Sequence, residues 1–181
     1  LIQNLAKRLA SIAKARFLLV CSDYDGTLAP LALRPEQARL LPRAYNIING
    51  LAQLTGTRVA IISGRSVSNL RQHSGFDRPI VLIGSHGAEL STRASYEGNS
   101  DKKLKLEALE SRLLRICAQA PGVWIERKPL GMAVHVREAT RADAKSIVRQ
   151  VNDELVQLDW VHIIRGKAVI DLSLSRADKG D

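Results

Sequence analysis

A short apolar run followed directly by two aspartates is the feature that most constrains this chain. Residues 17–22 read Phe-Leu-Leu-Val-Cys-Ser and precede Asp23-Tyr24-Asp25-Gly26-Thr27. A short, unbroken apolar run that ends in a turn predicts a strand of a parallel sheet, buried on both faces. The aspartates then stand at the carboxyl end of that strand, where open α/β sheets bind their ligands. An ordinary Asp-Gly turn is the alternative to a ligand site.

The spacing of the two aspartates predicts a particular chemistry. Two carboxylates so close together repel each other unless a cation lies between them or one of them is protonated. A hard divalent ion such as Mg2+ removes that repulsion because it prefers oxygen ligands. An aspartate held by a metal can also act as a nucleophile. Asp23 and Asp25 are therefore candidate catalytic residues and candidate metal ligands.

The N-terminal half of the chain predicts alternating helices and strands. Apolar residues at helical spacing predict helices over residues 2–15, 36–54 and 67–72. Short apolar runs predict further buried strands over residues 58–62 and 80–83. Strands that alternate with helices are typical of a parallel sheet with crossover helices, so we expect an α/β core.

The pattern changes after residue 88. Residues 104–118 and 141–157 have helical periodicity, whereas the segments between and after them alternate as strands do. The predicted strands are Trp124–Lys128, Met132–Arg137, and a hairpin of Trp160–Ile164 and Lys167–Leu172 around Arg165-Gly166. Two helices on one face of an antiparallel sheet make a small α+β unit. We therefore expect a core over residues 1–88, an α+β cap over 89–173, and a return to the core over 174–181.

The charge balance bounds the partners of the chain. Lys and Arg number 27 and Asp and Glu 18, which gives a net charge of +9. A basic surface suits nucleic acid, membranes or phosphorylated small molecules. Aromatic residues make up only 4%, and the basic residues are scattered without a zinc or RNA-binding signature, which argues against nucleic acid. With no run of membrane-spanning length and no signal peptide, we expect a cytoplasmic protein without a membrane partner.

Cysteine usage fits a reducing compartment. Cys21 lies in the first predicted strand and Cys117 lies among apolar residues of a predicted helix. We expect both thiols to be small core side chains rather than a disulfide or a metal site.

Two further segments suggest phosphate chemistry. Ser63-Gly64-Arg65 follows the second buried strand, and a hydroxyl with backbone N–H groups at such a turn can hold a phosphate oxygen. A plain helix cap at Ser63 is the alternative. Near the end of the chain stands Asp178-Lys179-Gly180, where Lys179 could neutralise a phosphoryl group.

In this order the three segments resemble the first three motifs of the haloacid dehalogenase-like (HAD) phosphohydrolases. Four further segments narrow the resemblance to the trehalose-6-phosphate phosphatase branch of that superfamily. They are Gly84-Ser85-His86-Gly87-Ala88-Glu89, Glu126-x-Lys128, His135-x-Arg137 and Lys167-x-x-x-Asp171. The resemblance covers nearly the whole chain from about residue 17 onward.

The resemblance implies a Rossmann-like parallel-sheet HAD core with an inserted α+β cap, and a Mg2+-dependent phosphatase of a sugar phosphate. Asp23 would be the nucleophile and Asp25 the acid and base, with Mg2+ on the Asp23 carboxylate and the Asp25 carbonyl. The implied phosphate-binding residues are Ser63, Gly64 and Lys179. The implied substrate-binding residues are Arg65, His86, Glu126, Lys128, Arg137, Lys167 and Asp171.

The strand pattern of the cap supports this assignment. Residues two apart on a strand share one face, so these polar pairs could form one surface above the aspartates. Any half-solvated antiparallel sheet alternates in the same way, which is the alternative.

The chain departs from the family pattern at two points. The family usually has Glu where this chain has Asp171, and its fourth motif, an acidic loop with further Mg2+ ligands, does not occur before Asp181. We therefore expect a core that lacks its remainder. Phosphatases of sucrose phosphate, glucosylglycerol phosphate or mannosylglycerate phosphate are the enzymatic alternatives. A non-catalytic domain that regulates a fused sugar-phosphate synthase is the other, and a fused or associated trehalose-phosphate synthase-like domain is the expected partner.

Overall fold

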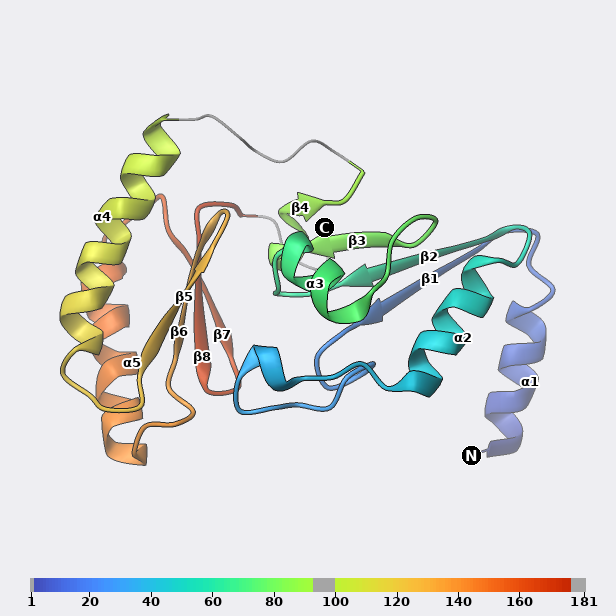
Figure 1. Ribbon diagram of the computed structural model, residues 1–181, viewed down its shortest axis with the longest axis horizontal. Coiled ribbons are helices and arrows are strands. Elements are labelled where there is room, and N and C mark those ends of the chain that lie inside the picture. Colours follow the sequence, from blue (N-terminus) through green and yellow to red (C-terminus); the bar gives the residue numbers. More distant parts are fainter. Residues whose placement is uncertain (1, 93–99, 177–181) are drawn as a thin grey trace.

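The computed structural model describes residues 2–92 and 100–176 of the chain (Figure 1). Two separate four-stranded sheets lie side by side. The first sheet has the order β1-β2-β3-β4, with β1, β2 and β3 parallel and β4 antiparallel to β3. Its strands are β1 (Leu18–Asp23), β2 (Thr57–Ile62), β3 (Val81–Gly84) and β4 (Glu89–Leu90). The sheet includes the two residues at the predicted start of the cap, Glu89 and Leu90.

The helices of this half are α1 (Ile2–Ile12), α2 (Pro42–Ala52) and α3 (Val67–Ser74), with 3-10 turns η1 (Pro35–Gln37) and η2 (Ser85–Gly87). Helices α2 and α3 pack against a core of large apolar side chains, whereas the described side chains of α1 are exposed. The largest buried side chains are Tyr24, Ile61, Leu70, Phe76 and Leu82. Strand, helix, strand, helix, strand is the predicted parallel arrangement, and it is confirmed.

The second sheet is the predicted cap. Its order is β5-β6-β8-β7 and all of its neighbours are antiparallel. Both long helices cover the face that is turned away from the first sheet (Figure 1). The elements are α4 (Ser100–Cys117), β5 (Trp124–Lys128), β6 (Gly131–His135), α5 (Arg141–Leu155), β7 (His162–Gly166) and β8 (Val169–Ser173). The predicted fold class is therefore confirmed.

The alternation along β6 places its side chains as the sequence predicted. Met132 and Val134 are buried against the helices. Ala133 and His135 face the other way, toward the first half of the molecule, and His135 lines the cavity described below. This second face is the one that supplies the cap residues of the candidate site.

The helix predicted over residues 36–54 begins only at Pro42. Residues 35–37 form a single 3-10 turn, and Ala38 and Leu41 have extended backbones. Proline favours the first turn of a helix because it has no N–H to lose there, so Pro42 sets the start. The segment before it becomes part of a long loop after β1, and this loop reaches the cap (Figure 1).

The first strand is buried on one face only, so the prediction of burial on both faces is wrong. Val20 packs with the core cluster, whereas Leu19 is 60% exposed and Cys21 is also exposed. Successive side chains of a strand point to opposite faces, and in the described part of the chain only the Val20 face is covered. Cys21 is therefore not a core thiol, while Cys117 is buried as expected.

The last hairpin turns two residues later than predicted. Gly166 pairs with Val169, so Lys167 and Ala168 form the turn. Ala168 has a φ of 62°, a left-handed value that two-residue hairpins use to match the twist of their strands. Lys167 therefore lies at the tip of the hairpin, at the edge of the cap. Among the described residues, every helix is too short or too polar to cross a bilayer.

Candidate active site

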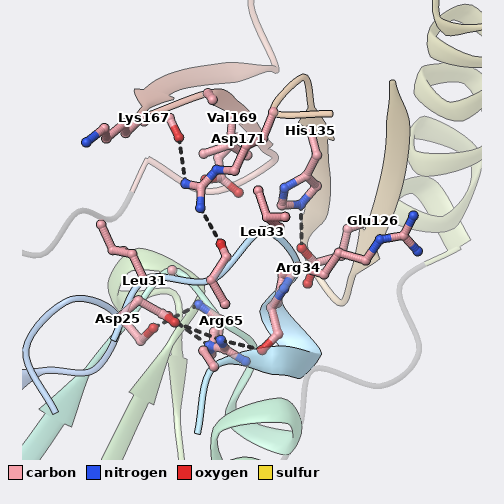
Figure 2. A pocket seen from close by; sticks show the side chains of 18 of the residues that line it. Asp25, Leu31, Leu33, Arg34, Arg65, Glu126, His135, Lys167, Val169 and Asp171 are labelled. Atoms are coloured by element: carbon pink, nitrogen blue, oxygen red, sulfur yellow. Dashed lines mark hydrogen bonds and ion pairs between the residues drawn. The ribbon is translucent and has the colours of Figure 1, made fainter. Parts of the chain in front are cut away.

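A cavity of about 380 Å³ lies between the two sheets. Its volume falls within the range of small-molecule sites. Figure 2 shows Asp25 and Arg65 on the core side, with Glu126, His135 and Asp171 across from them on the cap. All predicted site residues that the structure describes line this cavity: Asp23, Asp25, Ser63, Gly64, Arg65, His86, Glu126, Lys128, Arg137, Lys167 and Asp171. Lys179 lies outside the described residues.

The core wall is set by the register of β1 and β2. Asp23 ends β1 and pairs in parallel with Ile62, so Ser63 follows at the same edge of the sheet. The turn after Asp23 is anchored by Tyr24, which is fully buried and whose carbonyl accepts from the Leu28 and Ala29 amides at 3.0 Å. The aspartates and Ser63 therefore meet where the sequence predicted, at the carboxyl ends of the strands.

Arg65 holds Asp25 through both carboxylate oxygens. Its Nε and Nη2 donate to Asp25 Oδ2 and Oδ1 at 2.7 Å each. The guanidinium also donates to Asn69 Oδ1 and the Pro35 carbonyl, each at 2.8 Å, and its carbon lies 5.1 Å from the Tyr24 ring centre. Burial alone would lower the pKa of Arg65, but the Asp25 carboxylate outweighs it and raises the pKa above its ordinary value. Arg65 is therefore a fixed cation whose partner in this structure is the second aspartate.

The segment Ser63-Gly64-Arg65 is hereafter called the phosphate loop, after the role that the sequence predicts for it. The Ser63 amide donates to the Ile83 carbonyl at 2.9 Å, and the buried Ser63 hydroxyl accepts from the Arg65 amide at 3.2 Å. The cap of α3 is Ser66, whose hydroxyl accepts from the Asn69 amide at 3.2 Å. Ser63 is thus not the helix cap, and it lines the cavity.

The turn at residues 84–87 supports the phosphate loop from behind. The Ser85 amide donates to the Arg65 carbonyl at 2.7 Å, and the His86 amide donates to the Ser63 carbonyl at 3.0 Å. Ser85 and His86 have φ values of 48° and 57°, uncommon for residues other than glycine. The Glu89 carboxylate accepts from the Ser85 hydroxyl and steadies this turn. The His86 ring then lies against Gly64, so close that a Cβ there would stand 2.6 Å from it.

The cap wall carries an ordered row of polar side chains. His135 Nε2 lies 2.9 Å from Glu126 Oε2, and its ring stacks on Trp124 at 3.9 Å between centres. Arg137 donates to the Ala32 carbonyl of the core loop and, at 3.1 Å, to the Lys167 carbonyl. The contact of Arg137 with Ala32 joins the cap to the loop after β1.

A second group of contacts joins the cap to the phosphate loop. Lys128 Nζ donates to the Gly64 carbonyl at 2.9 Å and to Asp171 Oδ1. Asp171 Oδ2 lies 3.2 Å from His86 Nε2, although that nitrogen has no well-aligned hydrogen bond among the described residues. Burial alone would raise the pKa of Asp171, but His86 and Lys128 outweigh it, and the pKa lies below its usual range.

A profile of the trehalose-phosphatase family matches residues 21–181. The chain belongs to the trehalose-phosphatase family. Trehalose-phosphate phosphatase of Mycobacterium tuberculosis is 30% identical over 162 residues, which are 87% of this chain and 40% of that protein. The chain therefore spans about two fifths of the length of this curated relative.

Solved structures show the same fold. The C-terminal domain of trehalose-6-phosphate phosphatase from Candida albicans has a TM-score of 0.82 and 24% identity, over 95% of this chain and 62% of that one. The C-terminal domain of a Candida albicans trehalose synthase regulatory protein has a TM-score of 0.65 and 14% identity, over 96% and 61%.

Several cavity residues of this trehalose-phosphatase family member were missed by sequence reasoning. Leu31, Leu33 and Arg34 line the cavity from the loop after β1. Arg34 forms a bidentate ion pair with Glu138 of the cap at 2.7 and 3.0 Å. The predicted helix begins only at residue 36, and the residues between the aspartates and that helix were assigned no role. Its position directly after a strand end with two aspartates is the signal that could have revealed it.

The donor set at the aspartates fits Mg2+. Among residues 2–92 and 100–176, no three His, Cys, Asp or Glu side chains come together as a metal cluster. Mg2+ is commonly held by one or two carboxylates with waters and substrate phosphate oxygens, and it does not need a full protein cage. The Asp23 carboxylate suits that role. Because Arg65 occupies both Asp25 side-chain oxygens, Asp25 could contribute through its backbone carbonyl.

Proposed function

We propose that this protein is a Mg2+-dependent phosphatase that hydrolyses trehalose 6-phosphate to trehalose and phosphate. One observation carries the proposal. Asp23, Asp25 and Ser63 share a cavity with a polar wall of the cap. Membership of the trehalose-phosphatase family supports the substrate class. The cavity, about 380 Å³, matches a small molecule better than a protein or nucleic-acid partner.

The mechanism follows from the roles that carboxylates can take. Asp23 attacks phosphorus in line, and its new bond to phosphorus forms as the bond to the sugar oxygen breaks. Asp25 gives a proton to the leaving sugar oxygen and later takes one from the water that hydrolyses the aspartyl-phosphate. The Asp23 carboxylate and the Asp25 carbonyl would hold Mg2+, which would offset the charge of the phosphoryl oxygens when bound. Ser63, Gly64 and Lys179 are proposed to hold those oxygens.

The pairing of Asp25 with Arg65 places a condition on this chemistry. Both Asp25 oxygens accept hydrogen bonds from the guanidinium. A carboxyl group that donates a proton needs one oxygen free to carry it. Asp25 must therefore turn out of the pair before the sugar leaves, and its partly exposed position in the cavity allows this.

The cap wall supplies groups that suit a sugar. Carboxylates accept hydroxyl protons, and cations donate to hydroxyl or phosphate oxygens. Glu126, Arg137 and Lys167 line the cap side of the cavity and are the proposed sugar contacts. The exposed Leu31 and Leu33 beside them offer apolar surface to the sugar ring.

A phosphate-release screen tests the proposal. The purified protein is assayed with trehalose 6-phosphate, sucrose phosphate, glucosylglycerol phosphate and mannosylglycerate phosphate, with Mg2+ and with a chelator. We expect release from trehalose 6-phosphate that needs Mg2+ and that Asp23→Asn abolishes. Asp77→Asn, which removes an exposed carboxylate outside the cavity, is the matched control and should keep wild-type release. Turnover by Asp23→Asn at the wild-type rate would rule out the mechanism.

A non-catalytic role is the second candidate, favoured by the likeness in fold to the regulatory protein of Candida albicans. It predicts binding of a sugar phosphate without release of phosphate. Calorimetric binding of trehalose 6-phosphate by a protein that releases none would support it over the enzyme.

A further inference from the structure

We propose that Glu89 is a positioning residue of the candidate active site. Its carboxylate holds the turn that fixes the phosphate loop, although Glu89 does not itself line the cavity. Its effect reaches the loop through Ser85 and through the first amide of α3. The part of this inference that concerns phosphate binding rests on the proposed function, whereas the part that concerns the order of the loop does not.

The Glu89 carboxylate uses both of its oxygens within the protein. Oε1 accepts a hydrogen bond from the hydroxyl of Ser85, a buried residue. Oε2 accepts from the Val67 amide at 3.4 Å, a longer and weaker contact. Val67 is the first residue of α3, where amides have no partner within the helix and a negative charge is favourable. The carboxylate therefore joins the turn at residues 84–87 to the start of the helix that follows the phosphate loop.

The register of the first sheet brings Glu89 to this position. Glu89 on β4 pairs with Gly84 at the end of β3 in antiparallel register. Residues directly opposite each other on antiparallel strands carry their side chains on the same face. Because Gly84 has no side chain, it leaves room for the Glu89 carboxylate to reach α3. A Cβ at Gly84 would stand 2.5 Å from the Val67 nitrogen and 2.8 Å from the Arg65 carbonyl oxygen, so glycine is needed for this close approach.

The turn that Glu89 holds is bonded to the phosphate loop at both of its ends. The Ser85 amide donates to the Arg65 carbonyl at 2.7 Å, and the His86 amide donates to the Ser63 carbonyl at 3.0 Å. Ser85 and His86 have φ values of 48° and 57°, and residues in this region persist only where their surroundings hold them. The bond from the Ser85 hydroxyl to Glu89 is a side-chain contact that does so. Without it, we expect both ends of the phosphate loop to lose their fixed position.

Inhibition by inorganic phosphate tests this effect on the loop alone. Phosphate has no sugar, and its inhibition constant does not depend on how much of the enzyme is folded. In Glu89→Ala we expect this constant to rise about 5- to 10-fold, the effect of about one lost hydrogen bond. We also expect kcat/KM for trehalose 6-phosphate to fall about 10- to 100-fold, because small displacements in an active site cost up to about 100-fold. A wild-type inhibition constant in Glu89→Ala would overturn the proposal, whatever happens to kcat.

Two further variants show whether the carboxylate acts through its two partners. Glu89→Gln keeps one acceptor oxygen, so it can replace the bond from Ser85, but its NH2 group cannot accept from the Val67 amide. We expect its inhibition constant to lie between those of the wild type and Glu89→Ala, and this variant keeps the test open if Glu89→Ala fails to fold. If Glu89 acts through Ser85, adding Ser85→Ala to Glu89→Ala should not weaken phosphate binding further. Fully additive effects of the two changes would contradict this route.

Asp143→Ala is the matched control. Asp143 also accepts a hydrogen bond from a hydroxyl at the start of a helix, because Thr140 Oγ1 at the N-terminus of α5 donates to it at 2.7 Å. Asp143 is exposed on the cap and does not line the cavity. We expect its inhibition constant and its kcat/KM to equal those of the wild type. Changes as large as those in Glu89→Ala would show a general effect of losing such a bond and would count against the proposal.

Amide hydrogen exchange tests the order of the loop without any turnover. In the ligand-free protein, Glu89→Ala should raise exchange in peptides that cover residues 63–67 and 85–87, and Asp143→Ala should change nothing there. Unchanged exchange in both segments of Glu89→Ala would refute the proposal. A wild type that neither releases nor binds phosphate would refute the proposed function, and the role of Glu89 in ordering the loop would then be judged by exchange alone.

Discussion

Replacing Arg65 by Met tests how much the buried ion pair of Arg65 contributes to the stability of the fold, compared with an ion pair at the surface. Met keeps an apolar stem of similar length and removes the guanidinium. Four hydrogen bonds are lost at once, two to Asp25 and one each to Asn69 and the Pro35 carbonyl. Because the Arg65 side chain is only 5% exposed, water cannot replace the guanidinium without opening the loop.

The exposure of Asp25, the partner of Arg65, sets how much free energy of unfolding is lost. Breaking a fully buried pair costs about 3–5 kcal/mol, and a hydrogen bond to a charged group contributes about 1.5–3 kcal/mol. Asp25 is 33% exposed, so water recovers part of the solvation of its carboxylate. The loss should therefore lie at the lower end, about 3 kcal/mol. For a chain of this size that corresponds to a fall in Tm of about 6–12 °C.

Thermal and urea unfolding of Arg65→Met and Arg127→Met measure this difference. Arg127 makes a similar bidentate pair with Glu110; the Glu110 side chain is 18% exposed, but the Arg127 side chain is 74% exposed, so water can take the place of its guanidinium. A pair open to water on the arginine side contributes about 0–1 kcal/mol, so Arg127→Met should unfold within about 4 °C of the wild type. Equal shifts for the two variants would refute the reasoning, because burial would then not decide what the pair contributes.

Three further predictions concern other parts of the chain. The pKa of Asp171 lies below its usual range because the effects of His86 and Lys128 outweigh that of burial. The ionised carboxylate therefore stabilises the fold above about pH 4. That contribution is lost as the pH falls through the pKa of the folded state. The difference in free energy of unfolding between wild type and Asp171→Asn should therefore shrink below about pH 4, and a constant difference in urea melts from pH 7 to pH 3 would contradict this. A thiol reagent at pH 8 should modify one thiol of the native protein, the exposed Cys21, and a second only after unfolding, because burial raises the pKa of Cys117 to about 11. Gly84→Ala should destabilise the fold by about 3 kcal/mol, because the new Cβ would stand 2.5 Å from the Val67 nitrogen. Gly50 lies within α2, and a Cβ there would meet no atom within 4 Å, so Gly50→Ala should stabilise the fold by about 0.5–1 kcal/mol in the same urea melts.

The sequence could predict the elements because each one carries its own periodicity. Alternation along β6 predicted Met132 and Val134 on one face and His135 on the other, and the structure turns the first face to the helices and the second to the cavity. The parallel strands and their carboxyl ends brought Asp23 and Ser63 to one edge for the same reason. These are local or topological consequences of side-chain spacing.

The predictions that were wrong concern segments where apolar residues are buried for a reason other than the predicted one. Leu40 and Leu41 fit a helical stripe, yet they belong to a loop in which Leu40 packs against the core. Cys21 fits a strand buried on both faces, yet its face is uncovered in the described residues. An apolar residue shows that burial is favourable at its position and does not show which element provides the contact.

The spacing of residues along the sequence could not predict which charged side chains of the site pair with each other. Arg65 was predicted to bind substrate because it follows Ser63-Gly64, but it reaches Asp25, 40 residues earlier in the chain. A guanidinium pairs with whichever carboxylate the fold brings into reach, and that depends on the path of the whole loop after β1. Only the folded arrangement shows that this cation serves the aspartate of the proposed acid and base.

The side chains that hold the cap against the core also line the cavity, and this couples closure of the cap to binding of a ligand. Lys128 reaches Gly64, Asp171 reaches His86, and Arg137 reaches the Ala32 carbonyl, and each of these side chains faces the cavity. A ligand that enters must either spare these contacts or replace them with its own. One that replaces them loosens the cap, and one that bridges the two walls tightens it. A molecule with a phosphate at one end and hydroxyls at the other bridges the walls, because the phosphate loop belongs to the core and the carboxylate of Glu126 to the cap. On the proposed function, this arrangement favours a phosphorylated sugar over free phosphate, which would touch one wall alone.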